Sequence, residues 1–418
     1  MSKMIQSHTP AFWRATLALC IASVMVFSNL YITQPLLPQL REVFGIDSLQ
    51  ATMSLSVATL SLGGCLLILG PLSDAIGRRV VILATLILLC LATFATAFAT
   101  DYTLLLILRA LQGAFIAGVP AAAIAYMGEE FESEALLLAV GLYIGANSLG
   151  GVAGRLMSGM AAAEWGWQSS FLLLAGFDLL CLLIVLRLLP ASRRFDAKPL
   201  RLGQVVRDLS SHLRNPLILT ACFVGGLNFM VFVNQYSYIT FVLAEQPYGL
   251  SSSWLGMLFL TYLSGTLAAG LSGRLVRNRS QPGAMGVGIL VFMVGSLLTL
   301  AGQLYWIVAG LFINALGFFF THSLASGWVA GHARTARGSA TSLYLTFYYA
   351  GATLGGFYLE PFWRWTGWLG VVAGSLLILS MTLSLTIWLG KRERREAKGT
   401  TSAVESDRFE EALTVKEY

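Results

Sequence analysis

The sequence has little charge for its length. Of 418 residues, 11% are charged and 56% are hydrophobic, whereas a soluble globular protein carries about 25% charged residues. An ordinary soluble domain is therefore excluded. Apolar stretches of about 20 residues, the length that a helix needs to cross a bilayer, can be marked off twelve times, at about 14–38, 50–70, 79–100, 102–128, 134–162, 168–189, 216–243, 253–273, 283–302, 304–329, 339–361 and 367–390. Because lipid offers the backbone no hydrogen-bond partners, these spans are predicted to be helices, giving an all-α membrane protein.

Cysteine pairs, nucleotide motifs and metal clusters are also missing. The five cysteines, Cys20, Cys65, Cys90, Cys181 and Cys222, all lie inside spans without CxxC spacing, which argues against a disulfide framework and a zinc site. The absence of a P-loop pattern argues against an ATP-driven pump. A membrane-embedded enzyme is the alternative from another class, but no nucleophile or metal constellation occurs in the spans. We therefore expect no enzyme activity, no cofactor and no metal.

The basic residues lie in alternate loops. They follow every second span: Arg78 and Arg79; Arg187, Arg193, Arg194, Lys198, Arg201, Arg207 and Arg214; Arg274, Arg277 and Arg279; Arg334 and Arg337; Lys391, Arg392, Arg394, Arg395 and Lys398. Arg41 and Arg364 are the exceptions. Lysine and arginine are enriched in cytoplasmic loops, so both termini are predicted to be cytoplasmic. The net charge of +6 thus reflects topology, and we expect no nucleic-acid partner.

The longest polar interruption divides the spans six and six. We predict an N-terminal half at 1–189, a cytoplasmic central loop at 190–215, a C-terminal half at 216–390 and a disordered cytoplasmic tail at 391–418. Apolar residues at helical spacing in the central loop indicate an amphipathic surface helix, with a disordered tether as the alternative. A shift of about 200 residues superimposes the halves as a weak repeat, for example Gly70 on Gly273. Such parallel halves are typical of alternating-access transporters.

One connection between spans has an unusual composition. Residues 70–79 read Gly-Pro-Leu-Ser-Asp-Ala-Ile-Gly-Arg-Arg. Gly70, Asp74, Gly77, Arg78 and Arg79 resemble the signature loop between helices two and three of the major facilitator superfamily, although Ala75 stands where that family usually carries a basic residue. The resemblance implies a conformational gate. A basic turn that merely anchors two helices is the alternative.

Acidic residues gather where span four reaches the same side. In the family that this chain resembles, such acids pair with the arginines of the signature loop. The resemblance therefore implies a contact of Glu129 or Glu130 with Arg78 or Arg79. Helix capping is the alternative, because Glu134 falls in the first turn of span five.

Three charges lie deep in the first half, and intramembrane charges are functional pointers. Arg109, Arg155 and Asp178 are each about 10–15 Å from a span end at 1.5 Å per residue. We predict that Asp178 pairs with Arg155, and the alternative is a protonatable coupling site. His322 in span ten is another coupling candidate because imidazole exchanges protons near neutral pH; a plain interhelical hydrogen bond is its alternative.

Arg109 and Gln112 belong to a second resemblance. Together with Gly113 they resemble the superfamily signature of span four, where the arginine is associated with proton coupling or with fixing span one. The two side chains lie one helical turn apart on one face. Asn29, Tyr31 and Gln34 are the predicted partners on span one. The alternative for Arg109 is a structural clamp without contact to substrate.

The resemblance is closest to drug-efflux-like proton antiporters, including arabinose-efflux-like permeases of the bacterial inner membrane. In that family spans one, four, seven and ten line the cavity, whose candidate residues here are Asn29, Tyr31, Gln34, Gln112, Asn228, Asn234, Gln235, Tyr238 and Asn314. The cavity spans carry no carboxylate in their membrane portions, so we expect a neutral or weakly anionic amphipathic solute. We predict a monomeric inner-membrane transporter that couples export to protons. A proton-coupled symporter for uptake of a small metabolite or sugar is the alternative.

Overall fold

The computed structural model describes residues 4–197, 202–276, 280–333 and 336–414. The N-terminal half holds α1 (Pro10–Tyr31), η1 (Gln34–Leu36), α2 (Leu37–Phe44), α3 (Ser48–Ile76), α4 (Arg78–Thr96), α5 (Tyr102–Ile116), α6 (Gly118–Glu130), α7 (Ser133–Trp165) and α8 (Trp167–Leu188). After the connecting helix α9 (Leu202–Leu213), the C-terminal half holds α10 (Pro216–Ala244), α11 (Ser252–Met257), η2 (Leu258–Thr261), α12 (Tyr262–Leu275), α13 (Gln281–Leu298), η3 (Thr299–Ala301), α14 (Leu304–His332), α15 (Arg337–Thr366) and α16 (Trp368–Thr414).

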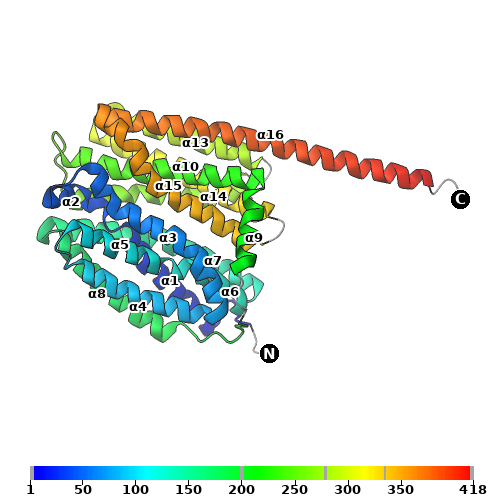
Figure 1. Cartoon of the computed structure of the whole chain (residues 1–418), viewed down its shortest axis with the longest axis horizontal. Coiled ribbons are helices and arrows are strands. Elements are labelled where there is room, and N and C mark those ends of the chain that lie inside the picture. The colour runs from blue at the N-terminus through cyan, green and yellow to red at the C-terminus, as the bar shows by residue number, and fades with distance from the viewer. Residues whose placement is uncertain (1–3, 198–201, 277–279, 334–335, 415–418) are drawn as a thin grey trace.

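The predicted all-helical membrane fold is confirmed. Eleven segments of the described chain are long and apolar enough to cross a membrane. The remaining predicted span, 339–361, lies in α15, whose 30 residues extend about 45 Å. Its many Tyr, Thr, Ser and Gly residues make α15 less apolar than the others. This composition suits its position, because α15 packs between α3 and α10 (Figure 1).

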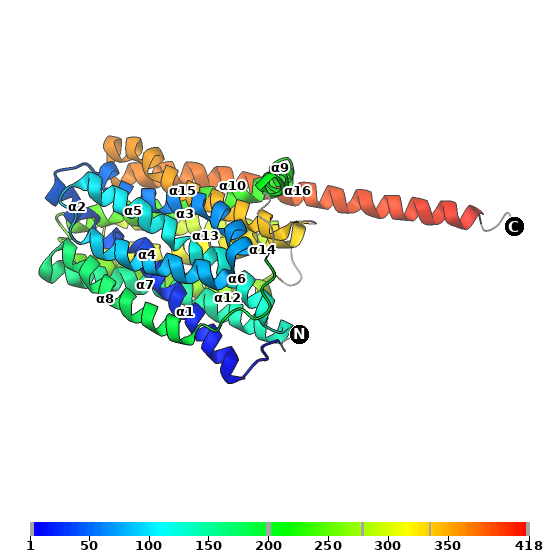
Figure 2. The same ribbon diagram turned by 60° about the horizontal axis from the view of Figure 1, so that its bottom comes forward.

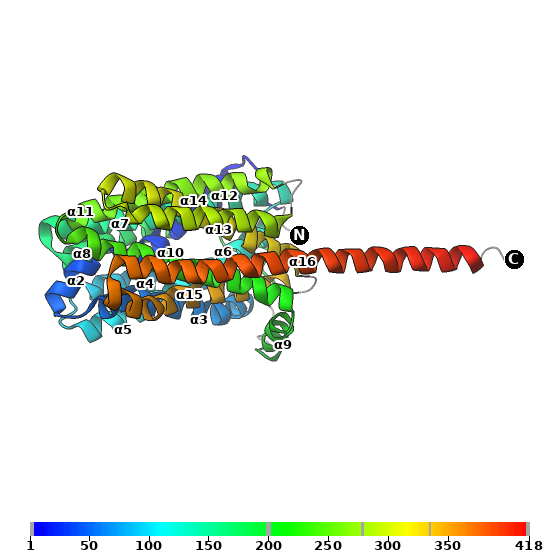
Figure 3. The same cartoon turned by 90° about the horizontal axis from the view of Figure 1, so that it is seen from above.

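The long helices run side by side, and the bundle has two distinct ends (Figures 1 and 2). We call them the α2 end and the α9 end after the short helices that lie there. The start of α1 and the protruding part of α16 are both at the α9 end. The halves meet through α3 against α15 and through α7 against α11. Figure 3 shows α16 running along the whole bundle and protruding beyond it at the end where α9 lies.

Glycines let α7 approach α1 closely. A Cβ atom on Gly150 would lie 2.6 Å from the Val24 carbonyl oxygen, and one on Gly154 would lie 2.3 Å from that of Ser28. These distances leave no room for a side chain, so the glycines are required for this packing. The close approach brings polar groups of α1 next to those of α7 and α8.

Two predicted segments differ from the structure. The sequence predicts a disordered tail from Lys391, but α16 continues as one helix to Thr414. Its Arg, Lys, Glu and Ala residues are good helix formers, which explains why the helix does not end at the membrane boundary. The predicted signature loop is also shorter than expected, because α3 continues to Ile76 and only Gly77 separates it from α4. Gly77 has a φ of 109°, a conformation that favours glycine.

Candidate substrate and coupling site

Arg78 is the centre of the signature segment at the α9 end. Its guanidinium forms an ion pair with Asp74 one turn earlier. Its Nε donates to Glu129 Oε1 at 3.1 Å, and its Nη1 donates to Ser73 Oγ at 2.6 Å. The structure thus contains the predicted contact between this segment and Glu129. All of these residues belong to α3, α4 and α6, so the cluster ties together helices of a single half.

The neighbouring residues of the segment have different partners. Arg79 donates to the Leu189 carbonyl oxygen at 3.1 Å. Glu130 accepts hydrogen bonds from the backbone N–H groups of Arg193 and Arg194 at 2.6 and 2.9 Å, so it holds the start of the connecting segment and does not pair with Arg78. A side chain on Gly70 would meet open space. Close packing therefore does not explain the glycine at that position.

Asp178 does not pair with Arg155, which corrects the sequence-based prediction. Both carboxylate oxygens accept from the Asn29 amide at 2.9 Å. Asn29 Oδ1 in turn accepts from Thr93 Oγ1 at 2.5 Å. The depth of a residue along its helix can be read from sequence, but the direction of its side chain around the helix cannot, and the face of α8 that carries Asp178 is turned toward α1 and α4.

Arg109 is held by neutral acceptors only. Its guanidinium donates to the carbonyl oxygens of Asn29, Leu30 and Ser54 at 2.8–2.9 Å and to Gln112 Oε1 at 2.7 Å. Gln112 Nε2 then donates to Thr93 Oγ1 at 3.0 Å. One hydrogen-bonded chain therefore runs from Arg109 through Gln112, Thr93 and Asn29 to Asp178. The chain links the carboxylate to the backbone of span one, where the clamp alternative also places Arg109.

Arg155 lies where the two halves meet. Its Nε donates to Gln34 Oε1 and its Nη1 to the Gly151 carbonyl oxygen, both at 2.7 Å. The guanidinium carbon is 4.0 Å from the ring centroid of Tyr31 and 4.4 and 4.6 Å from those of Phe259 and Tyr262. Gln34 also reaches the C-terminal half, where its amide donates to Ser237 Oγ at 3.1 Å.

His322 lies in an aromatic cluster between α14 and α15. Its Nδ1 is 2.9 Å from the Tyr344 hydroxyl. Its ring stacks on Phe318 with centroids 5.9 Å apart and lies 4.6 Å from that of Tyr348. His322 belongs to the C-terminal half and Asp178 to the N-terminal half, and their hydrogen-bond partners differ, so the two coupling candidates do not form one site.

Of the cavity candidates of the C-terminal half, Gln235 and Asn314 bind each other, and the others bind neighbouring helices. Gln235 Oε1 accepts from Asn314 at 2.6 Å and from Ser296 at 3.1 Å. Asn228 Oδ1 accepts from Thr382 at 2.9 Å. Asn234 donates to the Ala352 carbonyl oxygen at 2.9 Å.

These contacts repeat those of the N-terminal half at a shift of about 200 residues. Asn29 corresponds to Asn228, and Asp178 corresponds to Thr382. Gln112 corresponds to Asn314 by the same shift. The weak sequence repeat is therefore also a repeat of polar contacts, with the ionisable member present in the N-terminal half alone.

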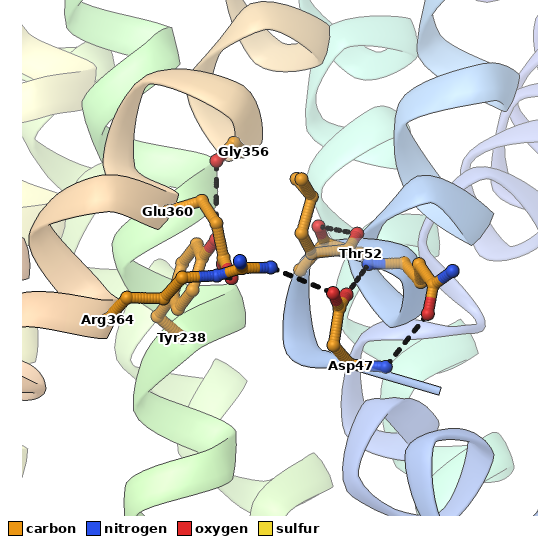
Figure 4. Close-up of polar contacts among 8 residues, drawn as sticks. Asp47, Thr52, Tyr238, Gly356, Glu360 and Arg364 are labelled. Carbon is orange, nitrogen blue, oxygen red and sulfur yellow. Dashed lines mark hydrogen bonds and ion pairs between the residues drawn. The ribbon is translucent and has the colours of Figure 1, made fainter. Parts of the chain in front are cut away.

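A group of charged residues joins the halves at the α2 end (Figure 4). Arg364 Nη2 lies 2.9 Å from Asp47 Oδ2, and Arg364 Nε lies 2.7 Å from Glu360 Oε1. Tyr238 donates to Glu360 Oε2 at 2.7 Å. The hydrogen bond with Glu360 raises the pKa of Arg364, so the guanidinium stays charged. We call Asp47, Tyr238, Glu360 and Arg364 the α2-end latch.

A second ion pair lies beside the α2-end latch. Arg41 Nη2 of α2 is 2.7 Å from Glu245 Oε1, just after α10. Sequence reasoning missed both sets of contacts, although a signal was present. Arg41 and Arg364 are the two basic residues that break the alternation of the loops, and each has an acidic partner in the opposite half.

The comparisons with known proteins agree with this architecture. The family model of the Major Facilitator Superfamily matches residues 19–356. The chain is 35% identical over 389 residues to the inner membrane transport protein YnfM of Escherichia coli (strain K12), covering 92% of each chain. It is 31% identical over 299 residues to the multidrug transporter MdfA of Edwardsiella ictaluri (strain 93-146), covering 68% of this chain and 71% of that one.

Solved structures share the fold at low sequence identity. The human organic anion transporter MFSD10 (TETRAN) superimposes with a TM-score of 0.70 at 17% identity, covering 90% of this chain and 100% of that one. A bacterial homologue of the human lysosomal transporter Spinster, in its inward-facing and unoccupied conformation, gives 0.73 at 15% identity, covering 92% and 98%. The sequence match and the shared fold establish that this chain belongs to the major facilitator superfamily of multi-pass membrane transporters, and it is not an enzyme.

Proposed function

We propose that the chain exports a small neutral or weakly anionic amphipathic solute across the inner membrane in exchange for protons. Alternating access of the two halves would carry the solute, with the α9 end and both termini on the cytoplasmic side. The similarity to the multidrug transporter MdfA supports export. The distribution of basic residues supports the orientation.

The observation that carries proton coupling is the neutral partner of Asp178. An arginine partner would hold the buried carboxylate in its ionised form, whereas a neutral amide donor favours that form much less. The carboxylate is fully buried. Its ionised form is therefore much more costly to keep inside the membrane than its protonated form.

The hydrogen-bonded chain connects proton binding at Asp178 with the position of span one. Taking up a proton at Asp178 removes one acceptor from the Asn29 amide. Asn29 carries the backbone carbonyl that Arg109 holds at 2.9 Å. A change at the carboxylate is therefore passed to α1, which packs against α7 at the junction of the halves.

The test uses everted membrane vesicles with a pH-sensitive dye and a panel of amphipathic compounds. A transported compound should release protons from the energised lumen. Asp178→Asn should abolish this signal, whereas Glu164→Gln, which removes an exposed carboxylate at the end of α7, should preserve it. His322→Ala tests the second coupling candidate in the same assay.

Two outcomes contradict the proposal. Transport that follows an imposed sodium gradient and ignores a collapsed pH gradient excludes proton coupling. Accumulation of the compound by intact cells would be compatible with proton coupling, but it would show that the chain is an uptake symporter.

A further inference from the structure

Arg155 is a buried cation with an unused donor. Its side chain is 1% exposed, and its Nη2 has no hydrogen-bond partner among the residues that the structure describes. The residue lies about ten positions before the end of α7 at Trp165, which is about 15 Å along the helix. With 33 residues, α7 is longer than a hydrocarbon core about 30 Å thick, and Arg155 lies about 9 Å from the middle of the helix, in the inner part of the membrane. The unused donor is therefore located where a transporter of this fold holds its solute.

Arg109 shows that an unused donor is not general for buried arginines here. Its Nε, Nη1 and Nη2 all donate, and the acceptors are three carbonyl oxygens and one amide oxygen. Arg155 has one side-chain acceptor, Gln34, and one carbonyl of its own helix. Both arginines are fully buried, but only Arg155 leaves part of its guanidinium fork free.

The described residues give Arg155 no carboxylate partner. Guanidinium remains protonated in proteins, so this position has a permanent positive charge inside the membrane that the aromatic rings of Tyr31, Phe259 and Tyr262 stabilise only in part. Within the described part of the chain, the Tyr262 hydroxyl is also buried without a hydrogen-bond partner. Two unused polar groups thus occur together, one charged and one neutral, inside an aromatic surrounding.

We infer that Arg155 binds an anionic group of the solute, and that a carboxylate attached to an aromatic body is the chemistry that fits. The free Nη2 and the Tyr262 hydroxyl supply the donors for the carboxylate. The rings of Tyr31 and Phe259 supply apolar surface for the body. This inference rests on the proposed transport function and narrows its solute from neutral or weakly anionic to anionic.

The position of Arg155 also connects the anion to closure of the protein. Tyr31 and Gln34 belong to the N-terminal half, whereas Phe259 and Tyr262 belong to the C-terminal half. The backbones of the two halves also approach closely here, because a Cβ on Gly256 would lie 2.7 Å from the Arg155 carbonyl oxygen. An anion at Arg155 therefore contacts both halves and stabilises the conformation that brings them together.

The test is binding to the purified full-length protein in detergent, measured by thermal shift and by titration calorimetry. The probes are phenylacetate, phenylpropionate and phenylbutyrate, each compared with its neutral primary amide. The wild type should bind at least one carboxylate, and its matched amide at least about tenfold more weakly, the size expected for a lost charge-assisted hydrogen bond.

Three variants locate the effect. Arg155→Gln should weaken carboxylate binding about tenfold or more, and Tyr262→Phe, a change that keeps the ring, should weaken it about threefold. Arg207→Gln on the exposed face of α9 removes a positive charge elsewhere and should leave binding unchanged. If Arg155→Gln does not fold, Tyr262→Phe still decides the matter.

Equal binding of acids and amides, or no binding of any probe, overturns the inference, and so does carboxylate binding that Tyr262→Phe leaves intact. Transport is measured separately in the vesicle assay. Carboxylate binding without any transport would support the anion site and contradict the proposed function. Transport of neutral solutes alone would support the proposed function and contradict the anion site.

Discussion

Asp47 and Arg364 are 317 positions apart in the chain, yet their side chains are 2.9 Å apart and connect the two halves. Arg364 also contacts Glu360, whose side chain is 7% exposed. The α2-end latch therefore includes one nearly buried carboxylate and two partners at the surface. In this conformation the halves are held together at the α2 end by charge as well as by packing.

Removing one partner of the α2-end latch should open the α2 end more often. Exposed ion pairs contribute about 0.2–1 kcal/mol, so Asp47→Asn should raise the population of the open state by up to about fivefold. The measurement is the rate at which a membrane-impermeant maleimide labels Ser56→Cys in a cysteine-free background. Glu42→Gln, an exposed acid on α2, is the matched control, and equal labelling rates in both variants would contradict a role for the latch.

Asp74→Asn should lower transport at least tenfold while the protein still inserts in the membrane. The substitution removes the charge that holds Arg78 on α4 next to the end of α3. Glu129 and Ser73 remain as partners, so folding should be preserved. Transport is measured in vesicles after matching expression levels. Asp196→Asn removes an exposed acid at the same end and should have little effect, whereas a fully active Asp74→Asn protein would show that the acid is dispensable.

Asp178→Asn should leave stability nearly unchanged and abolish proton coupling. Its partner is the Asn29 amide, so the substitution leaves no arginine unpaired, and the expected loss is about 1 kcal/mol. Thermal unfolding in detergent and the dye signal of everted vesicles are measured on the same preparation. A loss of about 3–5 kcal/mol, the cost of breaking a buried ion pair, would instead show that Asp178 has a charged partner in the membrane.

Arg109→Lys should destabilise the protein much more than Arg155→Lys. Lysine cannot reproduce the planar fork that binds the carbonyl oxygens of Asn29, Leu30 and Ser54, and the loss of two or more such bonds is about 3 kcal/mol. At Arg155 fewer bonds are lost. Thermal unfolding of the two variants in the same detergent gives the comparison, and equal destabilisation would contradict the distinction between a structural and a solute-binding arginine.

Most of the fold could be predicted from the sequence, because membrane-spanning helices follow from the lengths of contiguous hydrophobic stretches. The sequence also predicted the contact of Arg78 with Glu129, although it left three other pairings open. The partner of Asp178 could not be predicted, because depth in the membrane follows from residue number whereas the neighbours around a helix depend on tertiary packing. The α2-end latch was missed for the same reason, since its members come from α10, α15 and the start of α3.

The surroundings of Arg155 could be predicted only in part. Its burial could be read from the hydrophobic sequence around it. The unused Nη2 and the rings of Phe259 and Tyr262 became visible only in the structure, because they depend on how the C-terminal half meets α7.

Alternating access is the central claim of this account, and distances between spin labels at the two ends test it most directly. One pair replaces the exposed residues Val43 and Trp365 at the α2 end, and the other replaces the exposed residues Ile76 and Leu275 at the α9 end. Both pairs are measured in a cysteine-free protein with the intact latch and again with Asp47→Asn and Arg364→Gln. We predict that the latch variant has a longer distance at the α2 end and a shorter one at the α9 end. Distances that change at one end alone, or in the same direction at both ends, would contradict the account.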